Sequence, residues 1–119
     1  MKPPDVVNAL AALAQEHRLA VFRLLVQAGS AGLPAGQIAE RLGIAAPTLS
    51  FHLAHLKQAG LAQCRREGRS LIYAAHYEAM NALMGFLTEN CCGGNALACN
   101  VPVCVPDAPA LSKRKAARG

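Results

Sequence analysis

At 119 residues the chain has room for one domain with a modest core, and its apolar runs fall far short of the roughly 18 residues that a membrane span needs. Hydrophobic residues make up 53% of it, yet only two Tyr and three Phe are aromatic, a composition that suits packed helices better than stacked sheets. The net charge of +5 favours an acidic partner such as nucleic acid, and the start M-K-P-P-D has no apolar signal core, so we expect a cytoplasmic protein.

The first predicted helix covers residues 6–14, V-V-N-A-L-A-A-L-A, and Asp5 is its expected N-cap. Its apolar face would consist of Val6, Leu10 and Leu13, while its alanines would allow another helix to approach closely. A small apolar helix of this kind covers either its own core or a partner chain. The sequence leaves both alternatives open.

The second predicted helix covers residues 16–28 and has a strong amphipathic pattern. Arg18 on its polar side is expected to point to solvent, and Gly29 ends the helix. The apolar residues that form its expected buried stripe are Leu19, Phe22, Leu25 and Val26.

Two short helices joined by a tight turn follow. The first covers residues 35–42, starts after Pro34 and is closed by Gly43. The second lies within residues 46–61, with Pro47 at its start. This arrangement indicates a helix-turn-helix, whose second helix enters the major groove of DNA.

This second helix, the predicted recognition helix, has one apolar and one largely polar side. Leu49, Leu53 and Leu56 recur at i, i+4 and i+7 and form the stripe that we expect to be buried. The other side and its flanks offer hydroxyl, imidazole, amide and ammonium groups, which can contact base edges and phosphates. The residues there are Thr48, Ser50, Phe51, His52, His55, Lys57 and Gln58.

Two strands joined by a turn are predicted next, over residues 61–66 and 70–74. Gly68 lies in the turn, where it can adopt a positive φ. A basic hairpin directly after a helix-turn-helix is typical of a wing that contacts backbone phosphates or enters a minor groove. The arginines that would contact DNA from this hairpin are Arg65, Arg66 and Arg69.

A final helix is predicted for residues 77–89, with an apolar face wide enough for a dimer interface. Two-fold pairing would set two recognition helices about one turn of DNA apart, so we expect a palindromic operator in double-stranded DNA. The fold class is therefore mainly α with a small β-hairpin, a winged helix-turn-helix of order α-α-α-α-β-β-α that dimerises through its first and last helices. The residues of the apolar face are Met80, Leu83, Met84 and Leu87.

The five cysteines are distributed unevenly along the chain. Cys64 stands alone on a predicted strand, where we expect a small half-buried residue. The other four crowd a short stretch, which in a reducing compartment favours a metal or redox site over structural disulfides. We therefore expect a DNA-binding and dimerisation domain over residues 1–90 and a cysteine-rich, partly disordered tail over residues 91–119. The four clustered cysteines are Cys91, Cys92, Cys99 and Cys104.

The order of helices, helix-turn-helix and wing, together with E-H-R-L-A-V-F-R-L-L, L-S-F-H-L-A-H-L-K-Q-A-G-L and R-R-E-G-R-S-L-I-Y, closely resembles the ArsR family. Members are dimeric bacterial winged-helix repressors that sense metals and metalloids, and the resemblance covers residues 6–89. It implies operator binding that ends when an effector binds. It also places DNA contacts at Ser50 and His52, with Thr48 nearby, whereas Ala45-Ala46 departs from the polar residues of many members.

Two of the family's effector sites have no counterpart here. The C-x-C-x-x-C arsenic box would fall at residues 34–39, which contain no thiol, and the zinc site on the last helix would have only His76 and Glu78. Some arsenic-responsive members instead carry an adjacent cysteine pair after the last helix and a third thiol shortly beyond, an arrangement that N-C-C-G-G-N-A-L-A-C matches. The resemblance thus implies arsenic(III), or antimony(III), as the effector. The matching ligands are Cys91, Cys92 and Cys99, with Cys104 as a spare or substitute.

Thiolate chemistry suits such an effector, because soft thiolates select soft ions. Adjacent cysteines on a regular helix point about 100° apart, so the helix must loosen at Cys91-Cys92, and Gly93-Gly94 supplies that freedom. A zinc or cadmium site that includes Cys104, a thiol redox switch and a DNA-binding module that senses nothing stay open as alternatives. We expect no enzyme, because no catalytic triad, phosphate-binding loop or cofactor fingerprint stands out.

Overall fold

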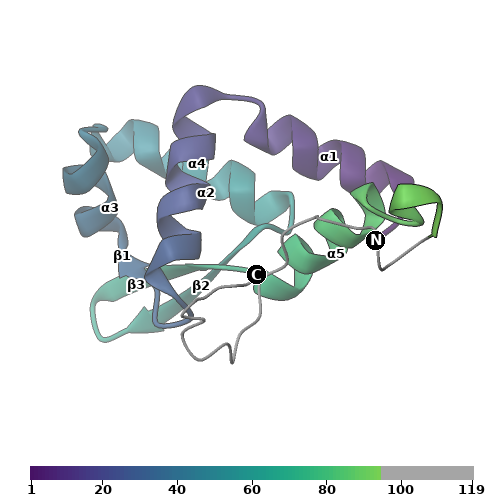
Figure 1. The fold of residues 1–119 in the computed structure, drawn as a ribbon. Helices are drawn as coiled ribbons and strands as arrows, with labels where there is room; N and C mark the ends of the chain where they lie inside the picture. The colour runs from purple at the N-terminus through teal and green to yellow at the C-terminus, as the bar shows by residue number, and fades with distance from the viewer. Residues whose placement is uncertain (95–119) are drawn as a thin grey trace, which may run out of the picture. The chain divides into compact units, whose positions relative to one another are not determined.

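The computed structural model describes residues 1–94 of the chain. The chain divides into two compact units, Met1–Glu89 and Asn90–Gly119. None of the described helices is long and apolar enough to cross a membrane. The predicted winged helix-turn-helix architecture is confirmed. The elements are α1 (Pro3–Leu13), α2 (Glu16–Ala28), β1 (Leu33–Pro34), α3 (Ala35–Leu42), α4 (Ala46–Gln58), β2 (Ala62–Glu67), β3 (Ser70–Ala75), α5 (Tyr77–Leu87) and a 3-10 turn, η1 (Cys91–Gly94) (Figure 1).

Helix α1 begins at Pro3, earlier than predicted, because proline has no N–H to lose in the first turn of a helix. Its N-cap is Lys2, so the prediction of Asp5 as the N-cap was wrong. The Asp5 carboxylate instead accepts a hydrogen bond from the Lys2 backbone N–H at 3.3 Å. A negative charge in the first turn also interacts favourably with the helix dipole.

The buried face of α1 is narrow, because it is built on Val6, Ala9 and Ala12. Of the apolar face that the sequence predicts, Val6 is buried, Leu13 is half-buried and Leu10 is 41% exposed. Because alanine has a very small side chain, these two alanines let α1 lie close to the helices it packs against, which are α2, α4 and α5.

The bounds of α2 match the prediction, but its buried face is rotated. Val21, Phe22 and Leu25 are buried, whereas Leu19 is 45% exposed, which corrects the predicted stripe. Arg18 does not point freely to solvent either. Its Nε donates to the Ala12 carbonyl at 2.6 Å, and so it caps the C-terminal end of α1, whose last carbonyls lack partners within the helix.

The helix-turn-helix of α3 and α4 is confirmed. Gly43 ends α3 in the left-handed conformation with φ of 64°. Leu49, Leu53 and Leu56 of α4 are all buried, as their spacing predicts. Gly60, with φ of 81°, follows Ala59 at the end of α4 and turns the chain toward the sheet.

The sheet has one strand more than predicted, in the order β1-β3-β2. β2 and β3 form the antiparallel hairpin, with Cys64 opposite Tyr73 in the register, and β1 pairs antiparallel with the other edge of β3. Gly32, just before β1, has φ of 75°, and a Cβ there would lie 2.5 Å from the Tyr73 carbonyl oxygen. Only glycine permits this approach of backbone to backbone.

Helix α5 ends at Leu87, two residues before the predicted end. Leu83 is buried and Met80 packs partly against the core, whereas Met84 and Leu87 are 45% and 58% exposed. The Tyr77 hydroxyl donates to the Val26 carbonyl at 2.8 Å and so connects α5 to the C-terminal end of α2. The sequence analysis did not identify this connection.

Candidate nucleic-acid interface

The orientation of α4 follows from its leucine stripe. Leu49, Leu53 and Leu56 are at most 2% exposed, and α4 packs against α1, α2, α3 and β2. Each residue of an α-helix turns about 100° from the one before, so the buried stripe fixes which side chains point outward. Thr48 and Ser50 are exposed in the first half of α4, the half that meets base edges in helix-turn-helix proteins.

Lys57 is exposed near the C-terminal end of the same helix. Together with residues of β2 it lines an open depression of about 460 Å³. Arg65 lines the same depression, so the helix and the base of the hairpin place two cations near each other.

His52 is less accessible than the sequence suggested, because it is half-buried beside α2. Its ring centroid lies 5.5 Å from that of His17. Burial lowers the pKa of His52 below its ordinary value of 6.5, and the charges of His17, Arg18 and His55 lower it further. The lowered pKa favours the neutral imidazole, which can donate a hydrogen bond from one ring nitrogen and accept one at the other.

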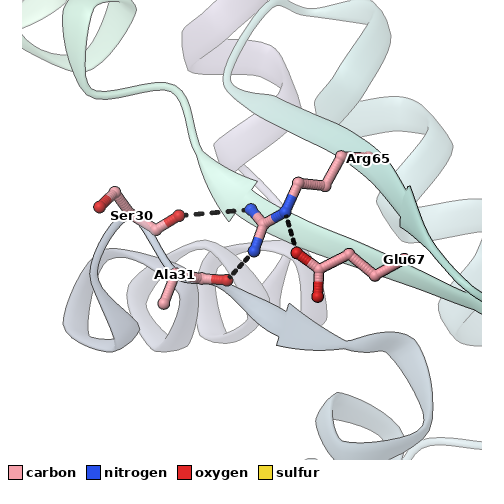
Figure 2. Close-up of polar contacts among 4 residues, drawn as sticks. All are labelled: Ser30, Ala31, Arg65 and Glu67. Carbon is pink, nitrogen blue, oxygen red and sulfur yellow. Dashed lines mark hydrogen bonds and ion pairs between the residues drawn. The ribbon is translucent and has the colours of Figure 1, made fainter.

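The arginines of the hairpin differ in their intramolecular contacts. The Nε of Arg65 contacts the Glu67 carboxylate at 2.7 Å, and a terminal nitrogen of Arg65 donates to the Ala31 carbonyl at 2.7 Å (Figure 2). A further bond at 3.4 Å reaches the Ser30 carbonyl. Arg66 and Arg69 are exposed, and within residues 1–94 neither forms an ion pair. We therefore expect phosphate contacts from these two and a positioning role for Arg65.

Cys91 and Cys92 lie in the 3-10 turn η1, so neither is part of regular α-helix. Cys92 has φ of 57°, a left-handed conformation that is rare outside glycine, and Gly93 follows with φ of 64°. The loosened backbone expected at this pair is thus present. Cys99 and Cys104 lie outside the described residues.

Cys64 has a structural place on β2. It is half-buried opposite Tyr73, and burial together with a hydrogen bond to Cys64 raises the pKa of that tyrosine. Among the described residues no three His, Cys, Asp or Glu side chains are grouped to hold a metal ion.

Comparisons with known proteins agree with this geometry. A family model described as a helix-turn-helix domain matches residues 13–65. The transcriptional regulator YgaV of Escherichia coli is 31% identical over 83 residues, which is 70% of this chain and 82% of YgaV.

Solved structures give the same result. An ArsR-like transcriptional regulator from Rhodococcus sp. RHA1 superposes with a TM-score of 0.64 at 26% identity, over 71% of this chain and 76% of that one. The homodimeric winged helix-turn-helix DNA-binding domain of Mb0332 from Mycobacterium bovis superposes with a TM-score of 0.59 at 28% identity, over 78% and 86%.

Proposed function

The chain belongs to the ArsR family of winged helix-turn-helix transcriptional regulators, and from this premise we propose that it is a homodimeric repressor that trivalent arsenic releases from its operator. As a member of this family it is a DNA-binding regulator and not an enzyme. The observation that carries the proposal is the adjacent pair Cys91-Cys92, placed in a loosened turn shortly after α5.

Operator recognition is assigned to the outward side of α4 and to the hairpin. Thr48 and Ser50 are exposed in the first half of α4, where hydroxyls can reach base edges, and His52 flanks them. Lys57, Arg66 and Arg69 supply cations for backbone phosphates, which contribute affinity without sequence information. Arg65 positions the hairpin through its bonds to the loop after α2.

Dimerisation is assigned to α1 and α5, which pack against each other in one protomer. Large apolar side chains on both helices are exposed to water in the monomer. A group of exposed apolar side chains of this kind is typical of an interface with another protein chain. A second copy related by a two-fold axis would cover them, in line with the homodimeric domain of Mb0332. The exposed residues are Val7, Leu10, Met84, Phe86 and Leu87.

The effector site is assigned to Cys91, Cys92 and Cys99. Arsenite would exchange its three hydroxyl groups for three cysteine sulfurs. In each exchange the proton of the thiol leaves with the hydroxyl group as water, and the oxidation state of arsenic does not change. An arsenical with one carbon substituent would need two sulfurs. Because the cysteine pair follows the dimerisation helix directly, ligation would bind the downstream segment to the end of that helix and shift the dimer out of its DNA-binding geometry. Antimony(III) has the same thiolate chemistry.

The proposal is tested by fluorescence anisotropy of the reduced protein on its own upstream DNA, titrated with arsenite, phenylarsenite, zinc and cadmium. We expect the trivalent arsenicals to release the DNA and the divalent metals to leave it bound. Cys91→Ser and Cys92→Ser should abolish release, whereas Cys64→Ser, the matched control on β2, should preserve it. Release by zinc, by cadmium or only by peroxide would contradict the arsenic assignment.

The DNA contacts have a separate test on operator and random DNA. Ser50→Ala should weaken operator binding most, whereas Arg69→Ala should weaken binding to both DNAs alike and lower the salt dependence by about one unit. Equal losses of both variants on both DNAs would argue against α4 as the recognition helix.

A further inference from the structure

Phe51 is the most exposed of the large apolar side chains in the described part of the chain. It is 81% exposed, compared with 63% for Val7 and 58% for Leu87, the next two. Within residues 1–94 the ring contact that the structure records joins His17 and His52 and does not involve Phe51. The phenyl ring therefore contributes little to the stability of the folded monomer, and its exposure to water is unfavourable.

Phe51 lies on the side of α4 opposite the buried leucines. It is two positions from Leu49 and two from Leu53, which places it about 160° around the helix from each of these leucines. Its neighbours one turn away include Pro47 and Ala54, both exposed and too small to cover a ring. The ring thus protrudes from the middle of the surface assigned to DNA, between the hydroxyl of Thr48 and the later turns.

The major groove offers an apolar side chain one group to bind. Base edges there present donors and acceptors, with the C5-methyl group of thymine as the apolar exception. A phenyl ring placed against a thymine methyl removes apolar surface from water on both sides. Cytosine has no methyl group for the ring to contact. Against a purine edge the ring would cover polar groups without forming hydrogen bonds to them, and this is unfavourable.

We propose that Phe51 is a specificity-determining residue that reads the methyl group of one thymine in each half of the operator. The inference rests on the proposed binding of operator DNA by α4. It adds the recognition of one thymine by its methyl group, which hydroxyl groups and cations do not contact favourably. Phe51 is accessible in the monomer, and it lies on none of the elements assigned to the dimer interface, α1 and α5.

The test is a thymine scan of the operator with the full-length protein. Each thymine is replaced singly by deoxyuridine, which removes the methyl group and keeps the pairing and the O4 acceptor. Binding of the wild type, Phe51→Ala and Phe51→Leu is measured by anisotropy. Leu19→Ala serves as the control, because it also shortens an exposed apolar side chain (45% exposed) but lies on α2.

The wild type should bind about fourfold more weakly when deoxyuridine replaces one particular thymine of either half-site, because one buried methyl group is then removed. Phe51→Ala should bind the intact operator more weakly and be insensitive to deoxyuridine at that position, while Phe51→Leu should keep part of the sensitivity. Leu19→Ala should show the wild-type pattern. Unfolding temperatures of Phe51→Ala and the wild type should agree, because the side chain is exposed.

Two kinds of result would overturn the inference, and they can be told apart. A wild type that prefers its operator but tolerates every deoxyuridine, or a Phe51→Ala variant with the same thymine profile as the wild type, removes the role of Phe51 and leaves operator binding intact. A wild type that binds upstream and random DNA equally removes the proposed function itself, and the inference with it.

Discussion

The recognition helix α4 and the β2-β3 hairpin both face the assigned DNA surface, yet the protein holds them differently. Leu49, Leu53 and Leu56 fix α4 in the core, each at most 2% exposed. In the hairpin every residue from 65 to 71 is exposed, and Arg65 anchors it to the loop after α2. Packing in the core fixes the direction in which the outward side chains of a helix point, and contacts to base edges require such fixed directions. Attraction between a cation and a phosphate tolerates movement of the side chain. The difference predicts that α4 determines specificity and the hairpin contributes affinity.

The largest expected effect comes from the anchor of α4. Leu53→Ala should lower the free energy of unfolding by about 2–5 kcal/mol, because it leaves a cavity among packed side chains. Arg66→Ala, on the exposed hairpin, should change it by less than about 0.5 kcal/mol. Urea unfolding followed by circular dichroism measures both. If the two variants lost equal stability, the contrast between a packed helix and a loosely held hairpin would fail.

The next effect lies where the hairpin joins the rest of the sheet. Gly32→Ala should cost about 2–3 kcal/mol, because its φ is 75° and its new Cβ would collide with the Tyr73 carbonyl. Gly36→Ala is the matched control in α3, where a Cβ meets nothing within 4 Å, and it should stabilise the protein by up to about 1 kcal/mol. Thermal unfolding of both variants checks the pair. A neutral Gly32→Ala would refute the close approach of β3.

A smaller effect separates the arginines of the hairpin. Arg65→Ala should cost about 1 kcal/mol of stability, since it removes bonds to the Ser30 and Ala31 carbonyls. Arg66→Ala should leave stability unchanged and reduce the slope of affinity against salt by about one unit. Denaturation and salt-dependent anisotropy on the same two proteins make the comparison. The assignment of Arg65 as a positioning residue would not survive if the two variants exchanged these behaviours.

The smallest effect concerns His52 on the flank of α4. Burial and the charges of His17 and Arg18 lower its pKa in the folded state, so protonation favours the unfolded chain. This contribution to stability is complete above the ordinary pKa of 6.5 and is lost as the pH falls through the lowered value. His52→Gln should therefore lose less stability than the wild type between about pH 8 and about pH 5. Unfolding temperatures at both pH values provide the measurement, and identical decreases would contradict it.

Periodicity and turn residues predicted most of the fold correctly. The bounds of α2 and α3, the leucine stripe of α4 and the hairpin depend on neighbours within a few residues, which a sequence displays directly. β1 was missed because a strand of two residues has no pattern of its own and exists only through its pairing with β3. For α1 the sequence left open whether its apolar side covers its own core or a partner chain, because the helices that α1 meets decide which side is buried.

For the candidate site, the sequence determined which chemical groups are available: the outward hydroxyls of α4, the arginines of the hairpin and the thiols of Cys91 and Cys92. Only the tertiary structure determined which of these groups are bonded within the protein and which are exposed to a partner. It bonded Arg65 to the loop after α2, half-buried His52 beside His17, and left Phe51 exposed. Local pattern is set by the spacing of residues along the chain. Burial and hydrogen bonding between residues about 35 positions apart are set by packing, which no local spacing encodes.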